Sequence, residues 1–195
     1  MVNKIIIGSH DTMTYLKPDK WYIRLFHFMA DCQDLTLEEQ LQYVDCVDLR
    51  VIYCDGVWHF AHGLAEYKQR EIFEVMNSIN KIKPNCYIRL ILEKVKKNRE
   101  LEFEQFKVLC KTLKDTYPNF NFFGGIYKTE WLQIYPFEHT GNNINQFISS
   151  MQKDVRLYEK ICPRAYAKRM NKINKLNVTN NINLFDFLEI DVIKK

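Results

Sequence analysis

The sequence predicts an α/β protein whose fold is a small or incomplete (β/α)₈ barrel of the TIM type. Two observations predict this class. Short apolar runs typical of β-strands alternate along the chain with segments of helical periodicity, which is the pattern of parallel β/α units. Charged side chains recur where these runs end, as they do at the mouth of such a barrel. An open doubly wound sheet is the alternative.

Eight apolar runs are expected to form strands. The chain has 195 residues, which is short for this barrel, so we expect a single domain spanning 1–195 in which some connections lack a full helix. One run, Ile144–Met151, fits a helix as well as a strand. The expected strands are Lys4–Gly8, Cys46–Tyr53, Val57–His62, Cys86–Glu93, Phe120–Tyr127, Glu130–Tyr135, Ile144–Met151 and Ile182–Glu189.

Four segments carry helical signals. Thr36 and Glu39 have the spacing of a capping box, so a helix is expected to begin after Thr36 and to run to about Tyr43. Pro163 stands directly before another helical segment, at a position where proline is tolerated. The remaining helices are expected from apolar stripes at helical spacing. Besides the helix after Thr36, the three expected helices, including the one after Pro163, are Gln69–Asn80, Leu101–Tyr117 and Arg164–Leu176.

The composition excludes several classes of protein. Hydrophobic residues make up 47% of the chain, enough for a core, and the net charge of +4 is too small to indicate nucleic acid binding. The six cysteines form no CxxC pair, so no zinc site is expected and a reducing compartment is favoured. No signal peptide or membrane span is visible, so we expect a cytoplasmic location rather than secretion.

Three short phrases, Gly8–Thr12, Val47–Val51 and Phe60–Gly63, lie at the ends of expected strands. Because the carboxyl ends of parallel strands open onto one face of a barrel, we expect their polar side chains to surround one pocket. Charged groups are costly to bury unless they pair or take part in function. For Asp48 and Arg50, the alternative to a functional role is a local ion pair. The candidates are His10, Asp11, Asp48, Arg50, His62, Glu93 and Asp186.

These residue types suit cleavage of a phosphodiester by attack of a neighbouring hydroxyl group. The reaction needs a base for the hydroxyl proton, an acid for the leaving oxygen and a cation for the phosphate. Two histidines can serve as base and acid, carboxylates can orient them, and arginine offers a permanently charged fork. We interpret His27, His59 and His139 as structural, since His59 points to the face of its strand opposite His62.

The same phrases resemble a known family, the catalytic X-type domain of phosphatidylinositol-specific phospholipase C, which is one of the PLC-like phosphodiesterase barrels. The resemblance is specific over residues 5 to 63 and weak from 120 to 180. Ile182–Phe187 looks like the last barrel strand of the family, which carries an aspartate. The matching phrases are Gly8–Thr12, Gln33–Leu41, Val47–Val51 and Phe60–Gly63.

The resemblance implies catalytic roles by position. His10 would be the general base with Asp186 as its partner, and His62 would be the general acid with Asp11 as its partner. The position of Arg50 is arginine in metal-independent bacterial members and a calcium-binding carboxylate in eukaryotic ones, so the guanidinium would replace the metal. The reaction would proceed through a cyclic phosphate, as in a phospholipase C that acts as a lyase or hydrolase.

Cofactor and substrate remain open at this point. Asp48 would position Arg50 or the attacking hydroxyl, and Glu93 stands at a calcium-ligand position of the metal-dependent members. Ca²⁺ could therefore be held by Asp11, Asp48 and Glu93, but an Arg50–Glu93 ion pair without metal is favoured. Inositol lipids are the substrates that the family implies. The expected substrate-binding residues are Arg50, Glu93, Lys94, Trp131 and Tyr135, the last two as stacking rings.

The expected partner is a phospholipid headgroup or another phosphodiester. Segment 13–32 combines aromatic residues with lysines and an arginine, so it is expected either to contact a membrane surface peripherally or to pack across the barrel top. Two other functions stay open. A glycerophosphodiester phosphodiesterase-like hydrolase would open with a His-Arg-Gly phrase, which His10–Thr12 is not. A catalytically silent lipid-headgroup binding module would need neither His10 nor His62.

Overall fold

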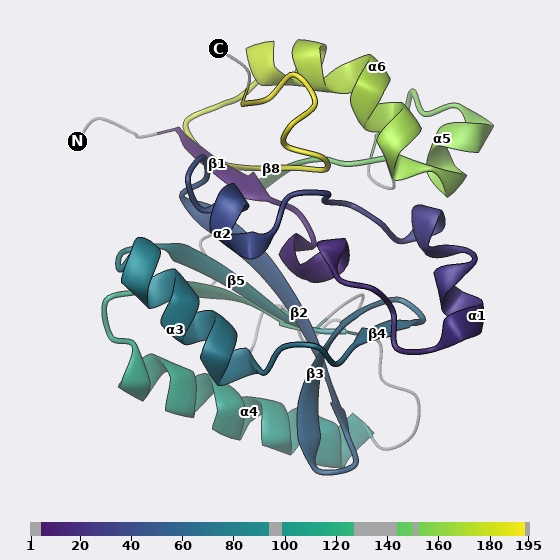
Figure 1. Ribbon diagram of the computed structural model, residues 1–195. Helices are drawn as coiled ribbons and strands as arrows, with labels where there is room; N and C mark the ends of the chain where they lie inside the picture. The colour runs from purple at the N-terminus through teal and green to yellow at the C-terminus, as the bar shows by residue number, and fades with distance from the viewer. Residues whose placement is uncertain (1–4, 94–98, 127–143, 150–151, 194–195) are drawn as a thin grey trace.

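A curled sheet of parallel strands forms the centre of the molecule (Figure 1). In this computed structural model the described residues are 5–93, 99–126, 144–149 and 152–193. The parallel strands are β1 (Ile6–Ser9), β2 (Cys46–Cys54), β5 (Tyr87–Leu92), β6 (Asn121–Ile126), β7 (Ile144–Phe147) and β8 (Ile182–Phe185). They lie side by side in the order β6, β5, β2, β1, β8, β7. The predicted incomplete barrel is confirmed.

One expected strand, Val57–His62, does not run parallel to its neighbour as a barrel strand would. Strand β3 (Val57–His62) runs antiparallel to β2, and β4 (Ala65–Tyr67) continues the same meander. The cause is the connection, because Asp55 and Gly56, both at positive φ, form a two-residue turn that can join only antiparallel strands. Since β1 ends early, β3 pairs with the edge of β2 that lies beyond it.

The predicted helices are confirmed with small shifts of their ends. Thr36 caps α2 in a capping box with Glu39, but this helix ends at Gln40 instead of Tyr43. Helices α3 and α4 lie together below the sheet in Figure 1, whereas α6 lies across the opposite side near β1 and β8. The short elements are η1 (Thr12–Tyr15), α1 (Trp21–Arg24), η2 (His27–Met29), α2 (Leu37–Gln40) and α5 (Leu157–Ile161), and the long ones are α3 (Ile72–Ile82), α4 (Arg99–Thr116) and α6 (Pro163–Leu176).

Two apolar clusters hold these layers together. The larger one joins the outer face of the sheet to α2, α3 and α4. The smaller one contains Ile6, Cys46, Phe123, Ile182 and Leu184 and fills the inside of the sheet near the start of the strands. A side chain at Gly8 would meet Leu184 and Cys46 within 3 Å, so the interior is tightly closed at this level. The end of the barrel that carries the strand carboxyl ends is therefore left for polar groups.

Two expected strands need comment. Within Ile144–Met151, which fitted either structure, Ile144–Phe147 forms the strand β7, whereas Glu130–Tyr135 lies outside the described residues. Among the helices of the described part, none is both long enough and apolar enough to cross a membrane.

Candidate active site

The seven charged candidates lie together at the carboxyl ends of the strands. His10 follows β1 directly, Glu93 follows β5, and Asp186 follows β8. Asp48 and Arg50 are two residues apart on β2 and share its inner face. Strand β3 pairs with the edge of β2 beyond the last residue of β1. This pairing brings His62, the last residue of β3, close to the other candidates. All of them are buried except His62, which is partly exposed.

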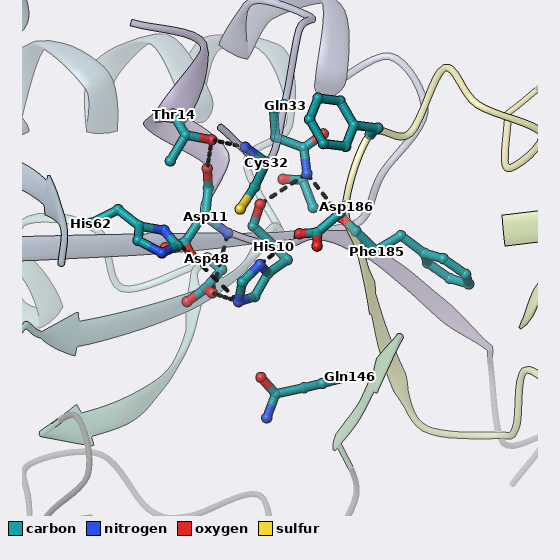
Figure 2. Close-up of polar contacts among 12 residues, drawn as sticks. His10, Asp11, Thr14, Cys32, Gln33, Asp48, His62, Gln146, Phe185 and Asp186 are labelled. Atoms are coloured by element: carbon teal, nitrogen blue, oxygen red, sulfur yellow. Dashed lines mark hydrogen bonds and ion pairs between the residues drawn. The ribbon is translucent and has the colours of Figure 1, made fainter. Parts of the chain in front are cut away.

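His10 is held at both ring nitrogens. Its Nδ1 lies 2.8 Å from Oδ1 of Asp186 (Figure 2), and its Nε2 lies 2.6 Å from Nη2 of Arg50. The backbone around it is fixed by Gln33, whose buried amide donates to the carbonyl oxygens of His10 and Phe185, each at 2.8 Å. Because arginine can only donate, His10 accepts at Nε2, and its proton is on Nδ1 toward Asp186.

His62 has a carboxylate partner of its own. Its Nδ1 lies 2.5 Å from Oδ2 of Asp11, which projects from a left-handed backbone conformation at φ 45°. Burial disfavours the charged imidazolium, but Asp11 more than compensates, so the pKa of His62 is raised above 6.5. Burial likewise opposes the charge of Asp11, yet Arg50 and the two histidines hold the pKa of that carboxyl well below its ordinary value.

Arg50 is surrounded by three carboxylates. Its Nε lies 2.5 Å from Oδ1 of Asp11, its Nη2 lies 3.3 Å from Oδ2 of Asp48, and its Nη1 lies 3.6 Å from Oε2 of Glu93. These are the three carboxylates that the sequence offered as a possible Ca²⁺ site. Because the guanidinium already occupies the space between them, the side chains present do not fit a calcium ion.

Glu93 links the arginine to the strand that carries His62. Its Oε1 accepts a hydrogen bond of 3.2 Å from the backbone N–H of Gly63, the residue after His62. Burial raises the pKa of Glu93, and Arg50 and His62 only partly oppose this. The carboxylate therefore fixes the end of β3 relative to Arg50.

Four residues of the site received no role from the sequence. Arg89 donates to Oδ2 of Asp48 at 3.2 Å and to Oε1 of Gln146 at 3.4 Å. Its spacing of four residues from Glu93 on one strand, which puts both on the same face, was the available signal. The Cys32 thiol points into the space between Asp11, His10 and Asp186 (Figure 2), and burial raises its pKa. The four are Cys32, Gln33, Arg89 and Gln146.

Three expected substrate-binding residues cannot be placed. Lys94, Trp131 and Tyr135 lie outside the described residues, as does His139. Segment 13–32 is placed, and α1 and η2 within it have no buried residue. The large side chains Trp21, Tyr22 and Phe28 are therefore exposed, whereas Tyr15 and Ile23 of the same segment pack against the core.

The arrangement supplies the groups needed for acid and base chemistry on one phosphate. Each imidazole is oriented by its own carboxylate through Nδ1, so Nε2 is the nitrogen that could serve a substrate, and in His10 this nitrogen accepts from Arg50. The two ring centroids are 6.4 Å apart, so both rings can reach substituents of a single phosphate group. Arg50 lies against His10 and offers the charge that such a group requires.

Comparison with known proteins supports the fold. No family model matches the chain, and no curated protein matches it by sequence. Among solved structures, the phosphatidylinositol-specific phospholipase C from Listeria monocytogenes is similar, with a TM-score of 0.58 and 18% sequence identity. The match covers 93% of this chain and 87% of that one. The chain therefore has a fold similar to that of this phospholipase C, and its own sheet forms a partial barrel.

Proposed function

We propose that the protein is a phosphodiesterase of the phospholipase C type that cleaves a phosphatidylinositol-like lipid by internal attack. The observation that carries the proposal is the pair of histidines, each with a separate carboxylate partner, beside one arginine. A module that only binds a headgroup needs no base and no acid, so this pairing favours an enzyme over a binding module.

In the proposed reaction, Arg50 binds the non-bridging oxygens of the phosphate. Nε2 of His10 takes the proton of the headgroup hydroxyl next to the phosphate, and that oxygen forms a bond to phosphorus. The bond from phosphorus to the lipid oxygen breaks, and His62 gives its proton to this leaving oxygen. The products are a cyclic phosphate of the headgroup and a diacylglycerol, and water can then open the cyclic phosphate by the reverse proton transfers.

A membrane surface is the proposed setting. Trp21 is 72% exposed, and the whole of α1 and η2 presents large apolar side chains with Lys20 beside them. Helix α5 adds a second exposed apolar group on the same side of the molecule, to the right in Figure 1. Amphipathic segments of this kind suit peripheral contact with lipid headgroups. We call these residues the rim patch: Trp21, Tyr22, Leu25, Phe26, Phe28, Met29, Leu157, Tyr158 and Ile161.

The test is incubation of the purified protein with phosphatidylinositol micelles, with and without EGTA, followed by phosphorus NMR. Inositol cyclic phosphate in both samples is the expected result, because Arg50 stands in for a metal ion. Product that disappears with EGTA would instead assign Asp11, Asp48 and Glu93 to a calcium site. No product with Ca²⁺ supplied, but turnover of glycerophosphodiesters, would favour the glycerophosphodiesterase alternative.

A further inference from the structure

Cys32 differs from the other buried cysteines of the described chain in its surroundings. Cys46, Cys86 and Cys110 belong to the apolar clusters, where a thiol acts as a small apolar group. Cys32 is equally buried, but its sulfur points into the charged cluster (Figure 2). Its backbone N–H donates to Oγ1 of Thr14 at 3.0 Å, which fixes the residue at this place. A soft metal ligand thus stands among histidines and carboxylates.

The thiol has two sets of partners at separations that suit a shared metal ion. One set is Asp11 with His62, and the other is His10 with Asp186. In each set, one ligand atom from every residue, the Cys32 sulfur included, lies within 4.8 Å of the others. Thiolate, imidazole and carboxylate are the ligands that bind Zn²⁺ in proteins, and three of them leave a fourth position open.

The set that contains His62 is the better one for a metal ion. Both carboxylate oxygens of Asp11 and Nδ1 of His62 are buried in close ion pairs, but they make no hydrogen bond of ordinary geometry within the described residues. The side chain of His62 is 25% exposed, which gives an ion a route from the solvent. In the other set, Nδ1 of His10 already has a hydrogen bond of 2.8 Å to Asp186, and both side chains are buried.

The charges of the cluster also favour a cation. Four carboxylates meet two guanidiniums there, so the cluster is negative when its histidines are neutral. Arg50 opposes a cation beside Asp11, but it contacts Oδ1, whereas Oδ2 faces His62. The two oxygens can therefore serve the guanidinium and a metal ion at once. The carboxylates are those of Asp11, Asp48, Glu93 and Asp186, and the guanidiniums are those of Arg50 and Arg89.

We propose that Cys32, His62 and Asp11 form a binding site for a thiophilic divalent cation such as Zn²⁺. The ion displaces the proton of the Cys32 thiol, which passes to the solvent, and binds the neutral form of His62. The three residues are far apart in the sequence, so no local spacing such as CxxC indicates the site.

Inhibition of the enzyme by this ion is the expected consequence, and that part rests on the proposed function. The acid form of His62 is an imidazolium with protons on both ring nitrogens. A metal ion bound to Nδ1 prevents this form, so His62 could no longer give a proton to the leaving oxygen. The cation would therefore act as an inhibitor that removes the acid and leaves His10 with Asp186 intact.

Binding can be measured with Cd²⁺, because its bond to a thiolate absorbs in the ultraviolet. We expect the wild type to show this absorption and Cys32→Ser to lose it. Cys54→Ser is the matched control, since it removes a more exposed thiol beside Asp55 and should keep the absorption. Asp11→Asn and His62→Gln should each weaken Cd²⁺ binding by at least about tenfold, because even loss of a residue that only supports a ligand costs this much.

The same measurements can overturn the proposal. It fails if the absorption is absent from the wild type or survives in Cys32→Ser. It also fails if binding depends on Asp186, tested with Asp186→Asn, and not on Asp11. NMR of the wild type labelled at its histidine nitrogens needs no variant. Cd²⁺ should shift Nδ1 of His62 and leave Nδ1 of His10, and the opposite result refutes the site.

Turnover tests the inhibition separately. Zn²⁺ should inhibit cleavage of phosphatidylinositol by the wild type, EDTA should restore it, and Cys32→Ser should lose a smaller fraction of its own activity. Equal fractional inhibition of both proteins would refute the inhibitory role. If the wild type cleaves no phosphodiester, the proposed function fails, whereas the Cd²⁺ measurements still decide whether the metal site exists.

Discussion

Arg50 donates to the ring nitrogen of His10 that a substrate hydroxyl would need. The distance from Nη2 to Nε2 is 2.6 Å, and the other ring nitrogen faces Asp186. In the free protein the proposed base, His10, thus accepts a hydrogen bond from the proposed phosphate-binding cation, Arg50. A bound phosphate would compete for the guanidinium and release Nε2 for the hydroxyl that attacks it. In the proposed reaction Arg50 therefore both holds Nε2 of His10 before the substrate binds and binds the phosphate afterwards.

The first prediction follows from that double task. Arg50→Lys should lower turnover of a soluble phosphodiester by about a hundredfold to a thousandfold, the cost of removing a positioned charge donor. An ammonium group cannot reach Asp11, Asp48, Glu93 and the phosphate as a planar fork does. Kinetics of the purified variant, with Arg156→Lys as a control on the exposed surface, would measure this. Activity close to that of the wild type would show that the fork is not required.

The second prediction separates the two histidines. His10→Ala and His62→Ala should each reduce cleavage of phosphatidylinositol by about a hundredfold or more, as expected for loss of a general base or acid. With a para-nitrophenyl leaving group, which departs without a proton, His62→Ala should lose much less activity while His10→Ala stays impaired. His59→Ala, on the opposite face of β3, is the matched control. Equal losses on both substrates would contradict the assignment of His62 as the acid.

The gathering of these charged residues could be predicted from the sequence, because phrases at strand ends converge in a parallel barrel, whereas the pairing of each histidine with its carboxylate came from the family resemblance. His10, Arg50, Glu93 and Asp186 needed only the expected strands and their direction. The capping box of α2 was visible for a similar reason, since it depends on neighbours in the sequence. Local signals and strand ends therefore carried the prediction.

The remainder depends on contacts that local patterns do not contain. The direction of β3 was set by a two-residue turn, and its effect on His62 appears only when the edge of β2 left free by β1 is known. Arg89 reads as an interruption of an apolar run, and its contact with Gln146 joins residues 57 positions apart. Such pairs are fixed by the strand order, which the sequence alone left undecided between a barrel and an open sheet.

The third prediction concerns stability against pH. His62 has a raised pKa, so its contribution is complete below about pH 6.5 and declines as the pH rises through its folded-state value. Asp11 has a lowered pKa, so its contribution is present above about pH 4 and is lost as the pH falls. The stabilisation due to their pairing should therefore be largest between about pH 4 and 6.5.

Urea unfolding of Asp11→Asn beside the wild type would test this. The difference in unfolding free energy should be greatest near pH 5 to 6 and should decline as the pH rises through the folded-state pKa of His62, while the contact of Asp11 with Arg50 remains. Asp55→Asn is the control, because Asp55 lies in the β2–β3 turn at positive φ, which asparagine tolerates. A difference that does not change with pH would show that His62 and Asp11 are not paired in solution.

The fourth prediction concerns the rim patch. Trp21 and Phe26 are 72% and 60% exposed, and replacing apolar contacts of this size with small polar ones removes area that would enter a lipid interface. Trp21→Ser with Phe26→Ser should weaken sedimentation with phosphatidylinositol-containing vesicles roughly tenfold or more, since each buried ring contributes on the order of 2 kcal/mol. Val108→Ser, 59% exposed on α4 and away from this patch, is the matched control. If the double variant also loses turnover of a soluble para-nitrophenyl phosphodiester, the patch supports the structure of the barrel mouth itself. If vesicle binding is unchanged, membrane contact lies elsewhere.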